Sequence, residues 1–256
     1  MDGIYRSRVA LALVSMGVFS ALWQAIVWIG GYPGFILPSP LAVALRWGEL
    51  LANGTLWWHM RVTLTEILIG LGLGTVIATL LGYVIAHSPL AEQLLSPFIV
   101  ASQSVPTVAI APLLVIWFGS GILSKILVCA LIVFFPILVN TVVGVRGVGE
   151  ELRDLMRTLE ASHWQMVWML EVPAALPTLL GGLKVGATLA VIGAVVGEFV
   201  AADQGLGYLL KQGQQVYDTA QVFVGIGTLV ILAQALYGTV AVAERRLLRW
   251  RQTESK

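Results

Sequence analysis

The sequence has little charge and almost no cysteine. Asp, Glu, Lys and Arg make up 11% of its 256 residues, whereas 58% are hydrophobic and the mean hydropathy is +0.88. This composition excludes a disordered or collagen-like chain and is typical of a membrane protein. Because Cys129 is the single cysteine, no intrachain disulfide or cysteine-based metal site can form. The net charge of +1 offers no basic excess, so we expect no nucleic-acid partner.

Signatures of enzyme chemistry are also missing. The sequence contains neither His-Glu-x-x-His nor Gly-x-Ser-x-Gly, so we expect no catalytic residue and no metal ligand. The three histidines are expected in three separate loops: His59, His87 and His163. Residues 119–125 end in a lysine, but Ser124 and Ile126 stand where a phosphate-binding loop needs Gly and then Ser or Thr. This segment therefore predicts a tight turn, not an ATP site.

Long uncharged runs predict six transmembrane helices, because crossing about 30 Å of hydrocarbon takes about 20 apolar residues. The predicted spans are 9–31, 65–86, 97–118, 123–145, 177–199 and 219–243. Pro106 and Pro112 are expected to kink the third span. The predicted fold class is all-α, a polytopic membrane protein forming a single domain over residues 1–256 and in contact with membrane lipid.

The distribution of basic residues predicts that both termini lie in the cytoplasm. With the N-terminus inside, ten basic residues fall on the cytoplasmic side: Arg6, Arg8, Arg146, Arg153, Arg157, Arg245, Arg246, Arg249, Arg251 and Lys256. Four fall outside: Arg46, Arg61, Lys125 and Lys211. The positive-inside rule favours this orientation in a bacterial-type plasma (inner) membrane.

Small and ionisable residues in the spans have two expected roles. Glycines at short intervals favour close helix packing in two sets: Gly70, Gly72 and Gly74, then Gly182, Gly186, Gly193 and Gly197. The ionisable residues nearest the spans are Glu66, His87, Lys184, Glu198 and Asp203. All five fall near predicted span ends, where we expect water to reach them. Glu198 is the candidate for a gate or for a contact with an external protein.

Two polar segments between spans predict further helices. On the outer side, Ser39 is placed as an N-cap before Pro40, and Asn53-Gly54 gives a stop, so a surface helix is predicted over 40–52. On the inner side, apolar residues recur at helical spacing up to about Leu159.

A second inner helix is predicted to start at Ser162, which is followed three residues later by Gln165 as in a capping box. Glu160 and Ala161 form the bend between the two inner helices, and prolines 173 and 177 are expected to close the second. Such a helix-bend-helix either docks on a partner or lies on lipid headgroups, and periodicity leaves both open.

This inner segment resembles the cytoplasmic signature of ABC importer permeases. Asp154-Leu155-Met156, Glu160, Leu170 and Val172-Pro173 have the spacing of Glu-Ala-Ala, Gly, Ile and Leu-Pro in that signature. The segments that resemble the nitrate, sulfonate, taurine and bicarbonate branch are 37–40, 111–113, 117–119, 173–177, 182–186, Glu198 and 205–207. The resemblance covers roughly residues 36–247.

The signature departs from the family pattern at the bend. Glu-Ala-Ala is replaced by Asp154-Leu155-Met156, and the usual glycine is Glu160. Glycine adopts positive φ at little cost, whereas Glu there carries a penalty of about 1 kcal/mol. The geometry of the bend, or of the groove that receives it, is therefore expected to differ from that of the family.

The resemblance implies a type I ABC importer permease with residues 150–171 as its coupling loop. Partners implied are a cytoplasmic ABC ATPase dimer that carries ATP and Mg²⁺, an external solute-binding protein, and a second copy of this chain. The chain itself would hold no cofactor and would not be an enzyme. Residues expected to contact the ATPase are Asp154, Leu159, Glu160, Ala161, Ser162, His163 and Trp164. Residues expected along the translocation path or gate are Glu198, Gly186, Gly193, Pro112 and Trp117.

The expected solute is a vitamin-type aromatic. The runs 105–118 and 134–136 look most like those of permeases for riboflavin or a thiamine-precursor pyrimidine, and an apolar wall suits a flat ring better than nitrate. Sulfonates, taurine or nitrate remain the alternative solutes. The alternative function is a secondary transporter or channel without an ATPase partner, but the sequence shows neither repeated halves nor mid-membrane carboxylates.

Overall fold

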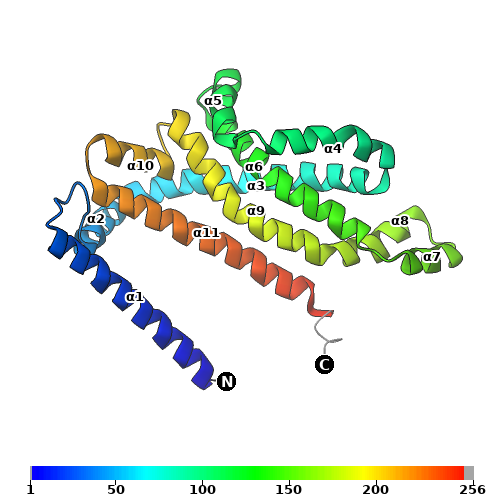
Figure 1. Cartoon of the computed structure of the whole chain (residues 1–256), viewed down its shortest axis with the longest axis horizontal. Helices are drawn as coiled ribbons and strands as arrows, with labels where there is room; N and C mark the ends of the chain where they lie inside the picture. Colours follow the sequence, from blue (N-terminus) through cyan, green and yellow to red (C-terminus); the bar gives the residue numbers. More distant parts are fainter. Residues whose placement is uncertain (1, 251–256) are drawn as a thin grey trace.

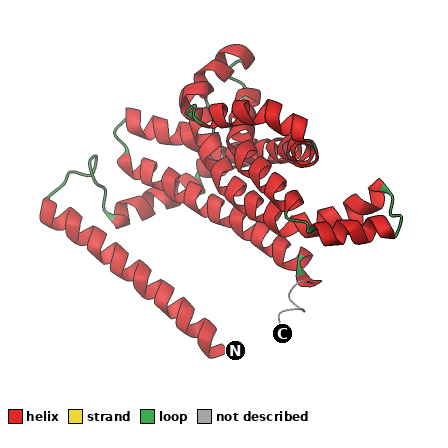
Figure 2. Cartoon of the chain, turned by 45° about the vertical axis from the view of Figure 1, so that its right-hand side comes forward, coloured by secondary structure: helices red, strands yellow, loops and turns green. Residues whose placement is uncertain are grey.

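The computed structural model describes residues 2–250, and helices form every element of regular structure in that range (Figures 1 and 2). In chain order they are α1 (Asp2–Gly30), α2 (Pro40–Ala52), α3 (Thr55–His87), α4 (Pro89–Gln103), α5 (Thr107–Phe118), α6 (Ile122–Arg146), α7 (Glu150–Thr158), α8 (His163–Gln165), η1 (Met166–Glu171), α9 (Val172–Ala201), α10 (Leu206–Gln215) and α11 (Thr219–Leu247). Arg251 and Lys256, used above for orientation, lie outside the described residues.

The core of the bundle is formed by α3, α6 and α9, with α10 and α11 packed against α9 (Figure 1). Glycines let these backbones approach closely, as predicted. A Cβ added to Gly74 of α3 would lie 2.7 Å from the carbonyl oxygen of Ala130 in α6. One added to Gly193 of α9 would lie 2.8 Å from the Cα of Cys129. Substitution at either glycine would therefore force two helices apart.

The packing role does not extend to Gly72. A Cβ on Gly72 would meet nothing within 4 Å, so the predicted role is wrong at this position. Helical geometry explains the difference, because residues four apart such as Gly70 and Gly74 share a face that Gly72 does not.

Four helices are long and apolar enough to cross a membrane: α3, α6, the continuous helix His163–Ala201, and α11. A fifth crossing is possible if α4 and α5 together form one span. In α1 the apolar stretch is the shorter Val14–Gly30. This helix diverges from the bundle (Figure 1) and contacts it near its C-terminal end, where Trp23 stacks on Phe223 at 5.1 Å.

The third predicted span, 97–118, is not one kinked helix. The chain breaks between α4 and α5, which meet at an angle of 97°. Pro106 occupies the break as the N-cap of α5, and it has no N–H to donate to a preceding carbonyl, which favours a break at this position. Pro112, also expected to kink the span, lies inside α5 without ending it.

The prolines after the inner segment do not end its second helix either. The chain passes from α8 through the π-helical turn η1 into α9, and Pro173 lies in the first turn of α9. The missing N–H of Pro173 falls directly after the π-helical turn, where the regular hydrogen-bond pattern of the α-helix is already interrupted. The second inner helix is therefore continuous with the predicted fifth span.

The predicted surface helix forms over the expected residues. Ser39 Oγ accepts a hydrogen bond from Ala42 N at 3.2 Å, Pro40 begins α2, and Asn53 is its C-cap. Gly54 follows with φ 79°, a left-handed conformation that glycine adopts without a steric penalty. Local capping chemistry is thus sufficient to define this helix.

Candidate functional site

Residues 150–171 project from the end of the bundle where α3 and α6 terminate (Figures 1 and 2). No residue of α7 is buried. The predicted bend lies where the sequence places it, and Glu160 has φ 53°. A left-handed glutamate is strained, so the local contacts must hold it. Glu160 N donates to Arg157 O at 2.9 Å, and Ala161 N donates to Met156 O at 3.0 Å.

The second part of the coupling loop begins with the predicted capping box. Gln165 N donates to Ser162 Oγ at 3.3 Å, and Ser162 N donates to Gln165 Oε1 at 2.8 Å. Trp164 and Trp168 follow on one face with ring centroids 5.3 Å apart, and they are 70% and 53% exposed. Two adjacent, largely exposed indole rings are typical of a surface that binds another protein.

The structure places the seven residues predicted to contact an ATPase at or near the surface of this loop. Ala161 is half-buried, and the other six are exposed: Asp154, Leu159, Glu160, Ser162, His163 and Trp164. Asp154 accepts from Arg157 at 2.9 Å, but both side chains are about two-thirds exposed. An exposed ion pair of this kind adds little to the free energy of unfolding. Burial within this chain therefore does not explain why the loop has these residues.

Glu198 lies inside the bundle and not at its surface. Its side chain is 0% exposed, and Oε1 accepts from Thr63 Oγ1 of α3 at 2.6 Å. Its Oε2 accepts from Gly207 N, at the start of α10. Thr63 Oγ1 also accepts from Leu206 N at 2.7 Å, and His59 Nδ1 accepts from Gly205 N at 3.0 Å. Glu198 therefore anchors the 205–207 turn to α3.

The expectation that water reaches all five ionisable residues is wrong for Glu66 and Glu198. Glu66 is 2% exposed because α3 begins at Thr55 and so encloses it several turns from the helix end. It interacts electrostatically with Glu198 and Lys125, and its Oε2 is buried without a hydrogen-bond partner among the described residues. Glu198 is covered because the 205–207 turn folds back over it.

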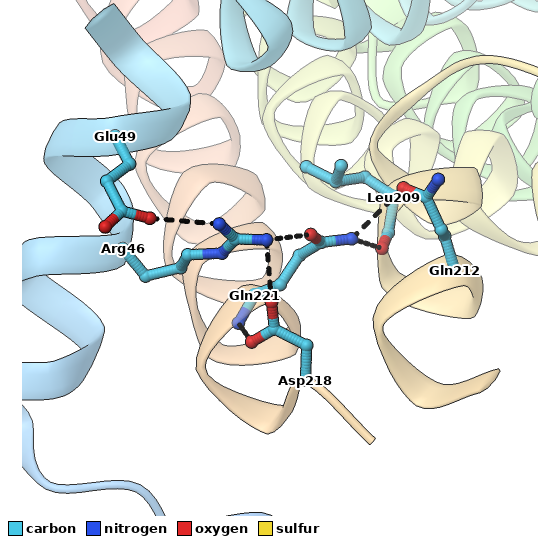
Figure 3. A network of polar contacts seen from close by, with 6 residues as sticks. All are labelled: Arg46, Glu49, Leu209, Gln212, Asp218 and Gln221. Carbon is cyan, nitrogen blue, oxygen red and sulfur yellow. Dashed lines mark hydrogen bonds and ion pairs between the residues drawn. The ribbon is translucent and has the colours of Figure 1, made fainter. Parts of the chain in front are cut away.

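The surface helix α2 is joined to α10 and α11 by a polar network (Figure 3). Arg46 Nη2 contacts Asp218 Oδ2 at 2.7 Å and donates to Gln221 Oε1 at 3.1 Å. Gln221 Nε2 in turn donates to Leu209 O at 3.0 Å. The hydrogen bond to Glu49 raises the pKa of Arg46 above its usual value, so the guanidinium group of Arg46 stays charged at any physiological pH.

The predicted path residues do not gather at one place. Gly186 faces Val133 and Ile137 of α6, and Gly193 faces Cys129. Pro112 and Trp117 lie exposed on α5, Trp117 with 66% of its surface accessible. The two glycines are thus packing residues in this conformation, and their role in a path stays a prediction.

The histidines are the remaining candidates for catalysis or metal binding. His59 and His87 lie in α3 and not in separate loops, and His87 lines the same cavity as His163 of α8. Helix α3 begins at Thr55, ten residues before the predicted span 65–86, and ends at His87, so both histidines fall inside it. Within residues 2–250, no three or more His, Cys, Asp or Glu side chains are placed to hold a metal ion.

Sequence reasoning missed Glu171, Thr63 and Arg153. Glu171 is 2% exposed and accepts hydrogen bonds from residues of α3, and Arg153 of α7 contacts it at 3.5 Å. The available signal was a carboxylate within an otherwise apolar run just before Pro173. Its partners are distant in the sequence, so the pattern alone could not identify them.

Comparison with known proteins identifies the class of protein that has this helical bundle, projecting loop and buried turn. The family model for "Binding-protein-dependent transport system inner membrane component" matches residues 70–249, well over half of the chain. The protein belongs to this family and is the permease subunit of an ABC importer, a multi-pass inner-membrane protein. The alternative of a secondary transporter or channel is not supported.

Individual relatives are similar along nearly the whole chain. The riboflavin transport system permease protein RibX of Chloroflexus aurantiacus is 46% identical over 237 residues, 93% of this chain and 88% of that protein. The formylaminopyrimidine transport permease protein ThiX of Halalkalibacterium halodurans is 36% identical, covering 91% and 92%. A putative aliphatic sulfonates transport permease protein, SsuC of Bacillus subtilis, is 33% identical, covering 94% and 87%.

Solved structures share the fold. An inward-facing conformation of the MetNI methionine ABC transporter gives a TM-score of 0.62 at 20% identity, covering 78% of this chain and 96% of that one. A crystal structure of an amino acid ABC transporter with histidines gives 0.61 at 14% identity, covering 79% and 96%. At these identities the likeness concerns the arrangement of helices alone.

Proposed function

We propose that the coupling loop binds a separate ATPase subunit, which carries ATP and Mg²⁺, and that two copies of this chain form the pathway. The exposed surface of residues 150–171 carries the proposal. Leu155 and Leu159 are 54% and 68% exposed, beside the indole rings of Trp164 and Trp168. Large apolar side chains on a charged segment favour a protein partner over water.

A membrane surface is the other way to cover these residues. The loop, however, projects from the bundle end as two short helices joined by a strained bend at Glu160. A segment lying on headgroups needs no such fixed bend, whereas a segment that fits a cleft does. This argument favours docking on the ATPase, whose closure would then shift the bundle between two states.

The proposed orientation places the coupling loop and both termini in the cytoplasm. Arg146, Arg153 and Arg157 lie at the loop end of the bundle, where α11 ends in Arg245 and Arg246. The positive-inside rule assigns this end to the cytoplasm. The opposite end, with α2 and α10, would then face the solute-binding protein.

Co-purification and uptake test the docking proposal. Tagged chain from native membranes should bring down an ATPase, and failure to do so would contradict the proposal. Replacing Ala161 or Trp164 with Asp should abolish coupled uptake while the protein remains inserted, because a charge would enter an apolar contact. Trp250→Asp is the matched control, since Trp250 is 49% exposed at the end of the chain beyond α11. Normal uptake by the Trp164 variant would exclude docking at this residue.

We propose a vitamin-type aromatic as the solute, riboflavin or a thiamine-precursor pyrimidine. Relatives named for riboflavin and formylaminopyrimidine are 46% and 36% identical to this chain, against 33% for one named for aliphatic sulfonates. A groove of about 300 Å³ between α3, α5 and α6 supports the choice, because its lining residues are all apolar. They are Leu73, Gly74, Ile77, Leu114, Leu127, Ala130, Leu131 and Phe134.

The solute is tested with the assembled transporter in proteoliposomes. Uptake of labelled riboflavin, a formylaminopyrimidine, taurine and nitrate should be compared with the cognate binding protein present. ATP-dependent uptake of riboflavin or of the pyrimidine is expected. Uptake of taurine or nitrate alone would overturn the solute assignment and leave the importer function intact.

A further inference from the structure

The coupling loop is held to the bundle through one buried carboxylate. Glu171 is the last residue of η1 and is 2% exposed. Its Oε2 accepts from Tyr83 Oη at 3.0 Å, and its Oε1 lies 2.8 Å from His87 Nε2, both on α3. Arg153 Nη2 of α7 lies 3.5 Å from the same Oε1. Glu171 therefore contacts the last turns of α3 and the first helix of the loop together.

Arg153 extends the connection to a third element. Its Nη2 also donates to Val145 O at 3.0 Å, near the end of α6. The two parts of the loop and the ends of α3 and α6 thus meet around Glu171. Breaking one side of a buried ion pair leaves an uncompensated charge, which is unfavourable. A displacement of the loop therefore moves α3 and α6 more readily than it separates from them.

Both ring nitrogens of His87 lie within hydrogen-bond distance of an oxygen atom. Nε2 faces the Glu171 carboxylate, and Nδ1 lies 3.0 Å from Tyr83 O, a backbone carbonyl. His87 therefore links the Glu171 carboxylate to the backbone of the last turn of α3.

Other charged groups surround this contact. Arg153 faces it from α7, and the cavity beside it, of about 270 Å³, is also lined by Arg157 and by His163 of α8. Behind α3, Arg146 of α6 donates to Ile85 O and pairs with Glu92 of α4 at 2.7 Å. Glu171 is the carboxylate among the groups that line this cavity. Its loss would remove the carboxylate that Arg153 contacts, whereas Arg157 would keep its pairing with Asp154.

We propose that Glu171 is a positioning residue that transmits the position of the coupling loop to α3 and α6 through its contacts with Tyr83, His87 and Arg153. Loss of these contacts then weakens the coupling between ATP hydrolysis and transport. The inference rests on the proposed docking of the loop on an ATPase. It adds the residue through which that docking reaches the membrane helices.

The test measures the number of ATP molecules hydrolysed per solute imported by the assembled transporter. Glu171→Gln keeps the size of the side chain but removes its charge, and should raise this ratio about fivefold or more. Glu171→Asp keeps the charge and should restore the ratio in part. Glu92→Gln is the matched control, because Glu92 pairs with Arg146 at the same end of the bundle without contacting the loop.

Milder variants keep the test decisive if Glu171→Gln fails to insert. Tyr83→Phe removes one hydroxyl and His87→Gln removes the imidazole ring, and both should raise the ratio. A wild-type ratio in Glu171→Gln, or in both milder variants, would overturn the inference. If the ATPase still co-purifies in that case, the docking proposal survives. If it never co-purifies with wild-type chain, the docking proposal itself fails.

Discussion

The α3–α6–α9 core and the coupling loop are built on opposite principles. In the core, glycines bring backbones into contact and carboxylates such as Glu198 are fully buried with hydrogen-bond partners. In α7 no residue is buried, and the large rings of Trp164 and Trp168 face outward. The core residues are explained by contacts within this chain, whereas burial within this chain does not explain the exposed apolar residues of the loop. Changes in the core should therefore alter stability, and changes in the loop should alter coupling.

The largest effect on stability is expected from Thr63→Val in the core. This change orphans Leu206 N and removes a donor from Glu198, both buried, and should lower the free energy of unfolding by about 3 kcal/mol. Thr75→Val is the control, because Thr75 Oγ1 bonds only Leu71 O of its own helix. SDS unfolding of purified protein measures both, and equal losses would contradict the anchoring role of Thr63.

A smaller loss is expected where two backbones touch. Gly193→Ala should destabilise the fold by about 2 kcal/mol, because the added Cβ would lie 2.8 Å from the Cα of Cys129. Gly72→Ala should instead stabilise it by up to about 1 kcal/mol, since its Cβ meets nothing and Ala favours helix. The same unfolding assay gives the sign of each change. A stable Gly193 variant would show that α6 and α9 separate easily.

In the loop, Glu160→Gly should increase stability, whereas most substitutions decrease it. It removes the cost of φ 53° for a glutamate, and should stabilise the local conformation by about 1 kcal/mol. Thr158→Gly, within α7, should instead weaken that helix by up to about 1 kcal/mol. Hydrogen exchange of residues 150–171 measures both. Faster exchange in the Glu160 variant would show that the bend is held by the side chain itself.

The smallest stability effect is expected at Trp164. Because its ring is 70% exposed, Trp164→Ala should change the free energy of unfolding by less than about 0.5 kcal/mol. Trp23→Ala should be measurably worse, since Trp23 stacks on Phe223. Thermal unfolding in detergent compares the two, and a large loss at Trp164 would place its ring in a contact within this chain.

The features predicted well are those with local causes. Ser39, Pro40 and Asn53 define α2, and the spacing of Ser162 and Gln165 defines the start of α8, because each involves bonds between residues two to four apart. The membrane class and the family resemblance likewise follow from composition and motif spacing. The predicted bend at Glu160 is of the same kind.

The features missed or misread depend on contacts distant in the sequence. The carboxylate of Glu198 was placed near water because its cover, the 205–207 turn, closes over it only in the folded bundle. The helix breaks at Pro106 but continues through Pro173. Which of the two happens depends on whether neighbouring turns supply hydrogen-bond partners for the free backbone groups, and the presence of a proline in the sequence does not reveal this.

The amino-acid sequence by itself determined that this protein lies in a membrane, and it determined the position of its helices and of the coupling loop. It could do so because hydropathy, capping and turn chemistry act between neighbouring residues. Only the tertiary structure decided which polar groups are buried and with whom. Glu171 contacts Tyr83 and His87, which lie 88 and 84 residues before it in the sequence. Such a pairing depends on how α3, α7 and η1 pack, and no local pattern encodes it.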